Sequence, residues 1–438
     1  MFLARLLVLF SLVCISCAHS SFEQKQLKHA LDFATSNRLE LEILLQHYTY
    51  DSLKLEAAKF LIRNMPHCYS YQQGSEMDSV KRVRTYYSPF GQIDQTYARR
   101  WGHYTYRNLP KIYDAHIITA EYLIDNIDRA FDNWQKRPWN RSLSFEDFCE
   151  YLLPYRIGDE PLEEWRELYE KKYGYLLDSI YKGSDVVEAA NLVSRHLQEP
   201  VFIYCEDFEL PHIGPRYLFS HRYGSCVDAA DIVTYAFRAV GIPCMEDTDA
   251  RGGHVWNVVR DTTGRDVPIW YIASEAVRGS RDTGGYKRGK VYRPMYGFQE
   301  AKAAHLGDDW KSMPLLFYHP YMKDVSYAYY PDTLRILTGI PDDEVCYLAH
   351  FHEAHWWSCA CARSASGKME IPNLESELVY LPMKYTKGNY YSSGFPFWFA
   401  GGEINTFLPD WEKTVKVRLY RKYPVYGWLR SFMGHVVG

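Results

Sequence analysis

Cys226 and His254 have the residue types and the surroundings of a nucleophile and its base. Ser225 precedes the cysteine and Asp228 follows, a pattern that predicts a helix over 225–240 with Cys226 in its first turn. His254 opens an apolar stretch that predicts a strand over 254–259. A helix N-terminus favours the reactive thiolate, and a nearby imidazole can serve as its base. The first-turn N–H groups could also hold an oxyanion.

Neither residue would indicate chemistry alone. A single cysteine in a helix is usually a small buried hydrophobe, and a single histidine is usually a hydrogen-bonded core or surface group. Together they favour one shared cleft, provided that the fold brings the two side chains within hydrogen-bond reach. Trp256 and Arg238 are expected to serve packing and the helix end instead.

The same residues resemble a known family. Tyr223-Gly224-Ser225-Cys226, the helix end Arg238-Ala239-Val240-Gly241-Ile242-Pro243 and Gly253-His254-Val255-Trp256 look like the core of the transglutaminase-like superfamily. The resemblance covers roughly residues 215–275. It implies a papain-like α+β core, with a helix against an antiparallel sheet. It also implies acyl chemistry on amides through a thioester, by transfer, peptide hydrolysis or deamidation.

The third member of the family's site is an aspartate on the strand after the histidine. By the family's spacing that position falls at Trp270, which carries no acid. Asp266 and Glu275 are the nearest carboxylates and are our candidates for orienting His254. Asn257 is a further candidate, since an amide can also hold an imidazole.

Composition predicts a folded chain of two or three domains. The 438 residues are 47% hydrophobic and 24% charged. A formal net charge of −4 gives no basic surface for nucleic acid, which we exclude as a partner. The chain has 38 tyrosines and 12 tryptophans, residues that suit surfaces binding peptides or sugars and that equally fill aromatic cores.

The N-terminus has the plan of an export signal over 1–17. Arg5 precedes the short apolar run Leu6 to Ile15, which is too short to span a bilayer permanently. Ile15-Ser16-Cys17 resembles the lipid-attachment box of bacterial lipoproteins, although Cys14 stands where such boxes usually carry leucine. We expect a body tethered to the outer membrane or cell surface through Cys17, or otherwise a periplasmic protein.

The periodicity of apolar residues predicts α+β architecture in three parts. Residues 18–200 have helical spacing, as in the stripe from Ile117 to Trp134. By the resemblance given above, residues 201–315 are expected to form the transglutaminase-like core. Residues 316–438 are expected to form a β-sandwich-like domain, with alternation clearest over Val415–Arg421. This order of signal, helical region, core and β tail looks similar to exported proteins of gut Bacteroidetes.

No metal or cofactor site is predicted. His350, His352 and His355 lack the spacing of a zinc motif, so we expect a solvated strand end there. The scattered cysteines do not predict a disulfide framework.

The sequence therefore predicts an exported cysteine enzyme that cleaves peptide or side-chain amides through a Cys226 thioester. Its partner would be a peptide or protein substrate, with a glycan as a further candidate. Hydrolysis is favoured over cross-linking, because water outcompetes an amine unless the cleft excludes it. The alternative is a catalytically inactive surface module that binds peptides or glycans.

Overall fold

The protein is described by a computed structural model. The structure describes residues 22–84, 105–204, 210–251, 253–270, 274–281, 287–299, 313–337, 339–352 and 355–413. The predicted export signal, Cys17 and the predicted strand Val415–Arg421 lie outside these residues. In the described part, no helix has the length and apolar character needed to cross a membrane.

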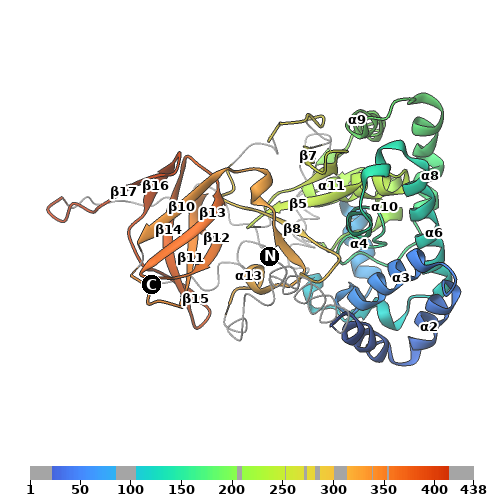
Figure 1. The fold of residues 1–438 in the computed structure, drawn as a ribbon, viewed down its shortest axis with the longest axis horizontal. Helices are drawn as coiled ribbons and strands as arrows, with labels where there is room; N and C mark the ends of the chain where they lie inside the picture. Colours follow the sequence, from blue (N-terminus) through green and yellow to red (C-terminus); the bar gives the residue numbers. More distant parts are fainter. Residues whose placement is uncertain are drawn as a thin grey trace, which may run out of the picture.

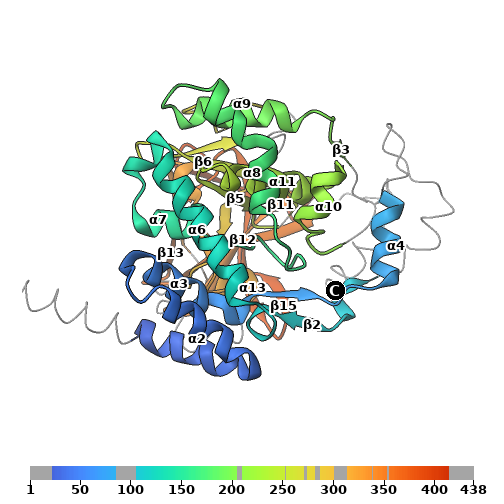
Figure 2. The ribbon, with the colours of Figure 1, turned by 90° about the vertical axis from the view of Figure 1, so that its right-hand side faces the viewer.

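Helices gather at one end of the molecule, and the C-terminal sheets occupy the other (Figure 1). A five-stranded antiparallel sheet lies between them. Figure 2, viewed from the helical end, shows the helices in front of the sheets. The mixed helix-and-sheet class, with a helical N-terminal region and C-terminal sheets, is confirmed.

The N-terminal helices begin where side chains cap their free N–H groups. Asp51 accepts a hydrogen bond from the N–H of Lys54 at 3.1 Å, as its N-cap position predicts. Ser144 accepts one from the N–H of Asp147 at 3.1 Å. The chain is helical over 22–33. The named helices are α2 (Arg38–His47), α3 (Ser52–Asn64), α4 (Ser75–Arg84), α6 (Ala120–Lys136), α7 (Phe145–Tyr151), α8 (Arg166–Tyr175), α9 (Val186–Leu197), α10 (Pro215–Ser220), α11 (Cys226–Ala239) and α13 (Leu315–Tyr318).

The central sheet has the strand order β7-β6-β5-β8-β9 and is antiparallel throughout. Helix α11 covers the face of β5 and β6 that carries Cys244, Asn257 and Val259. The opposite face, with Trp256 and Val258, closes a separate hydrophobic cluster. Its strands are β5 (Cys244–Asp249), β6 (Val255–Arg260), β7 (Asp266–Ile269), β8 (Val291–Pro294) and β9 (Met322–Asp324). Because β9 reaches Asp324, this sheet continues past the boundary expected at residue 315.

The C-terminal strands form a larger sheet and a two-stranded partner that share one hydrophobic core. Leu334 and Ile371 from the small sheet pack with Leu348, Tyr380 and Phe397 from the large one. The small sheet pairs β10 (Asp332–Leu337) with β13 (Lys368–Leu374). The large sheet contains β11 (Val345–His352), β12 (His355–Arg363), β14 (Leu378–Thr386), β15 (Asn389–Ser392), β16 (Phe397–Ala400) and β17 (Glu403–Thr406). Two short pairs complete the fold, β1 (Tyr69–Tyr71) with β2 (Lys111–Tyr113) and β3 (Ile203–Tyr204) with β4 (Tyr223–Gly224).

His350 does not occupy a solvated strand end, so that expectation was wrong. Its side chain is buried on β11, with a relative exposure of 2%. Burial lowers the pKa of the imidazole to about 4, although nearby Asp249 opposes the shift while His352 and Arg251 reinforce it. His350 is therefore neutral near pH 7.

We predict that His350 makes folding sensitive to acid. The unfolded chain binds a proton near pH 6.5, whereas the folded chain binds it only near pH 4. Stability from this group is thus fully present above pH 6.5 and is lost as the pH falls through that window, at most on the order of 3 kcal/mol. His350→Gln should flatten the pH dependence of the unfolding free energy between pH 6.5 and 4, measured by urea denaturation. The control is His355→Gln on β12; an unchanged slope in His350→Gln contradicts the prediction.

Candidate functional site

Cys226 occupies the first position of α11. Ser225 caps the helix: its hydroxyl accepts from the N–H of Val227 at 3.3 Å, and its own N–H donates to Asp228 at 2.8 Å. The thiol is largely buried. It forms no disulfide, and neither do the other cysteines of the described segments. The predicted helix, its cap and the cysteine's place in the first turn are confirmed.

His254 directly precedes β6 and is held through its main chain. Its carbonyl oxygen accepts from the hydroxyl of Thr248 at 3.0 Å and from the N–H of Asp249 at 3.3 Å. The imidazole is largely buried against two indoles. The ring centroid of Trp270 lies 4.6 Å away with its plane at 75°, and that of Trp256 lies 5.6 Å away.

Contacts along α11 and β6 show that Cys226 and His254 lie at the same end of this helix and strand. The N–H of Arg260 bonds to the carbonyl oxygen of Pro243, beyond the C-terminal end of α11. Further along, the Asn257 amide donates to the carbonyl oxygen of Ala230 at 3.0 Å. Cys226 lies about 6 Å along the helix axis from Ala230, in the direction away from Pro243. His254 lies about 10 Å along the strand from Asn257 in the same direction.

Asp266 does not orient His254, which corrects our first candidate for the acid. It pairs with Arg260 at the opposite end of β6, about 20 Å along the strand from the histidine. Its carboxylate is buried and accepts from Arg293 at 2.7 Å and from Tyr151 at 2.9 Å, with Arg260 at 3.1 Å. Asp266 is therefore part of a structural ion-pair network.

Glu275 and Asn257 also have other partners. Glu275 forms an ion pair with Arg195 of α9 at 2.6 Å, and its side chain is half exposed. Asn257 points toward α11, where its amide donates to Ala230 and to the hydroxyl of Thr234 at 2.9 Å. None of the three predicted candidates is brought to the imidazole. The ring of His254 packs against Trp270, at the position of the family's aspartate, and against Trp256.

Trp256 is itself fixed by buried polar groups. Its indole N–H donates to the hydroxyl of Tyr329 at 2.9 Å, and that hydroxyl donates to Asp247 at 2.6 Å. Asp247 in turn binds the guanidinium of Arg293 at 2.5 and 2.9 Å. Trp256, which packs against His254, is thus connected through Tyr329, Asp247 and Arg293 to Asp266. Asp266 can influence the imidazole only through this chain of contacts. No local pattern in the sequence indicates this network, because its members come from distant segments.

A second polar cluster was missed by the sequence analysis. Nδ1 of His212 bonds to the carboxylate of Asp231 at 2.9 and 3.0 Å, on α11. Burial opposes protonation, but Asp231, with help from Asp159 and Glu160, raises the pKa of His212 well above its usual value. His212 and Asp231 form a hydrogen-bonded pair at the side of α11, and burial also raises the pKa of the Asp231 carboxyl group.

Glu246 of β5 is buried beside this pair. Burial raises the pKa of its carboxyl group. Hydrogen bonding agrees, because the single hydroxyl proton of Thr234 faces two oxygens, the carbonyl of Ala230 at 3.1 Å and Oε1 of Glu246 at 2.7 Å. A protonated Glu246 can donate to Thr234 and leave that hydroxyl free to donate to Ala230. The signal available in the sequence was an acid inside an apolar run at Asp231 and another directly after an apolar run at Glu246.

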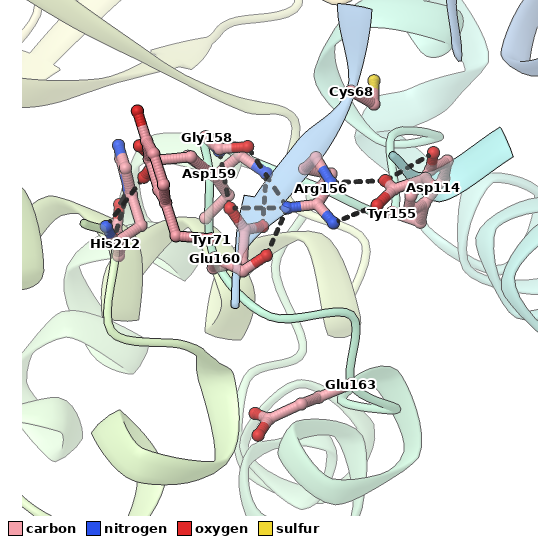
Figure 3. Close-up of polar contacts among 12 residues, drawn as sticks. Cys68, Tyr71, Asp114, Tyr155, Arg156, Gly158, Asp159, Glu160, Glu163 and His212 are labelled. Carbon is pink, nitrogen blue, oxygen red and sulfur yellow. Dashed lines mark hydrogen bonds and ion pairs between the residues drawn. The ribbon is translucent and has the colours of Figure 1, made fainter. Parts of the chain in front are cut away.

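His212 is held by a loop that is itself a charged cluster (Figure 3). The N–H of His212 donates to Asp159 at 2.9 Å, and its ring lies directly on Gly158. Glu160 accepts from the N–H of Gly158 at 2.7 Å. Figure 3 shows Arg156 between Glu160 and Asp114, and the guanidinium binds Asp114 at 2.5 and 2.6 Å. These contacts fix the loop against the helical region.

Comparison with protein-family models, with curated proteins and with solved structures finds no match. Within the described segments, no three His, Cys, Asp or Glu side chains converge as metal ligands. The assignment of chemistry therefore rests on the chain's own geometry.

We predict that Asp266→Asn destabilises the fold without changing the chemistry of Cys226. Removing the charge leaves Arg260 and Arg293 with one anion fewer in a buried site, which costs about 3 kcal/mol. The exposed Glu275→Gln should stay within about 0.5 kcal/mol of wild type. Urea unfolding and the alkylation rate of Cys226 in folded protein measure the two effects. Loss of reactivity at unchanged stability in Asp266→Asn would restore it as a site residue.

We predict that Gly158→Ala displaces His212. An added methyl group would stand 2.3 Å from Cδ2 and Nε2 of the ring, closer than atoms approach. The clash should cost about 1–3 kcal/mol of unfolding free energy. In the double variant with His212→Ala the clash disappears, so the two losses should be far from additive. Strict additivity in a double-mutant cycle would show that the ring does not lie on this glycine.

Proposed function

We propose that this protein is a cysteine-dependent amide hydrolase or acyltransferase with a transglutaminase-like core. The observation that carries the proposal is the location of Cys226 at the start of α11, at the end of the helix–sheet pair where His254 opens β6. A helix laid on an antiparallel sheet, with the cysteine at its N-terminus, agrees with the arrangement that the resemblance implies.

The proposed reaction begins when His254 takes the proton of the Cys226 thiol. The thiolate attacks the carbonyl carbon of an amide, and the oxyanion lies near the N-terminus of α11, where positive dipole and N–H groups favour it. The C–N bond then breaks as His254 returns the proton to the leaving amine, which leaves a thioester on Cys226. Water deprotonated by His254 attacks the thioester, and a carboxylate and the free thiol result.

The imidazole has aromatic neighbours where the family has an acid. Both indoles restrict the ring's orientation by contact, which is part of what a carboxylate does in a catalytic triad. They do not supply a negative charge to stabilise the imidazolium. We therefore propose that packing against these indoles contributes to the position of the ring.

Peptides or proteins are the proposed substrates, and hydrolysis is favoured over cross-linking because water is the abundant acceptor. We also propose export and a lipid tether at Cys17. Both rest on the sequence of residues 1–17 alone.

A binding module is the second candidate function. Asp266 and Glu275 form ion pairs with arginines away from His254. This observation favours the binding module, because neither candidate carboxylate contacts the proposed base. Under this alternative the cleft captures peptides or glycans without turnover.

The thiol's reactivity tests the proposal. We expect iodoacetamide to modify Cys226 faster than the other buried cysteines, with the rate read by peptide mass spectrometry. His254→Ala should slow the reaction at pH 7 by about tenfold or more, because the base is lost. Cys68 and Cys244 are internal controls, since burial raises the pKa of each thiol to about 12.

Turnover is tested with a library of peptide amides, followed by release of amine. Wild type should release amine, and Cys226→Ala should release none. If Cys226 reacts no faster than Cys244, and His254→Ala makes no difference, the enzyme proposal fails. If peptide binding then persists in Cys226→Ala, the binding module is the better description.

A further inference from the structure

The turn that carries His254 contacts the C-terminal sheet. This turn, of which the structure describes Ala250, Arg251 and Gly253, joins the end of β5 to the histidine. Ala250 packs against the hydrophobic core that the two C-terminal sheets share. It also packs against a second cluster, in which Tyr292 of β8 meets Tyr347 and Leu381 of the large C-terminal sheet. The turn is therefore shared between the central sheet and the C-terminal domain, and His254 follows it immediately.

Asp249 closes the turn from within. Its carboxylate accepts from the N–H of Arg251 at 3.1 Å and from the N–H of Gly253 at 2.8 Å. Its Oδ2 lies 3.8 Å from Nε of Arg251. Asp249 is almost fully buried, so these charge-assisted bonds are made away from water.

Arg251 joins the turn to the C-terminal domain. Its guanidinium carbon lies 5.5 Å from the ring centroid of Trp357 on β12, within cation–π range. The same guanidinium lies over Gly253: a methyl group added there would stand 2.5 Å from both Nε and Nη2. Arg251 is thus enclosed by the Trp357 ring, the Asp249 carboxylate and the backbone directly before His254.

Trp357 is fixed in turn by its own strand pair. It lies opposite His350 in the β11–β12 ladder, and its indole N–H donates to the carbonyl oxygen of His352 at 3.2 Å. A displacement of this hairpin would move the guanidinium, and with it the backbone at Gly253.

We propose that Trp357 and Arg251 are positioning residues for His254, so that the C-terminal domain is part of the reactive site. This inference rests on the proposed function. The domain sets the direction of the imidazole through the turn that directly precedes it. Neither residue touches substrate; each acts through Gly253.

The test compares Trp357→Leu with Trp357→Phe. Leucine removes the ring face under the guanidinium, whereas phenylalanine keeps one. The readout is the rate of iodoacetamide reaction at Cys226 across pH 5–9, together with thermal unfolding of each variant. Trp357→Leu should lower the rate near pH 7 by about tenfold, toward that of His254→Ala, and flatten the pH profile. Trp357→Phe should recover most of the rate.

Gly253→Ala is the independent second variant. The methyl group pushes the flexible end of Arg251 off the glycine and should reproduce the loss without unfolding, even if Trp357→Leu folds poorly. Trp398→Leu, on β16 away from the turn, is the matched control and should react as wild type does.

Wild-type reactivity in both Trp357→Leu and Gly253→Ala overturns the inference, and so does equal loss in the phenylalanine and leucine variants. Loss of rate in Trp398→Leu also overturns it, because the effect would then be general destabilisation. These results are separable from failure of the proposed function: if His254→Ala itself leaves the Cys226 rate unchanged, the catalytic pair is wrong. A strong His254 effect with a silent Trp357 rejects only the positioning role.

Discussion

The seating of α11 on β5 and β6 is the constraint on which the rest of the structure depends. Apolar contacts supply most of this interface, but three buried polar side chains fix its register. Asn257 bonds to the helix backbone at Ala230, and Thr234 bonds to Glu246 across the gap. A buried amide or carboxyl group that loses its partner costs about 1–3 kcal/mol, so a slipped helix would be penalised at each of them. That register is what leaves Cys226 and His254 at one end.

Buried charged side chains lie on the other face of the same sheet. Asp247 and Asp266 enclose Arg293, with Tyr151 and Tyr329 completing the hydrogen bonds. Such networks add little net stability over apolar packing but penalise any other arrangement. The network therefore holds Trp256 in place, and Trp256 packs against one side of the His254 imidazole. An acid that sequence reasoning assigned to catalysis thus serves the scaffold beneath it.

Local patterns in the sequence were enough to predict the helix and the strand of the site. They were not enough to predict which residues pair with Asp266 and Glu275. Ser225 and Asp228 predicted the start of α11, and the run after His254 predicted β6, because caps and apolar periodicity are local properties. Asp266 and Glu275 were chosen by proximity along the chain. Their actual partners, Arg293 and Arg195, come from other segments, and no spacing rule connects them. The prediction for His350 was wrong for a similar reason, since its ring packs near Gly289, a residue from an earlier segment of the chain.

Cys226 and His254 are held in place by different parts of the molecule. The cysteine begins a helix whose sides are held by the helical region, through contacts such as Asn133 with the carbonyl of Ala239. The histidine follows a turn lodged against the opposite end of the molecule. Cys226 keeps its place when the C-terminal sheets shift, because buried hydrogen bonds fix the register of α11 on β5 and β6. The distance between the sulfur and the imidazole therefore varies with how the turn before His254 sits against those sheets.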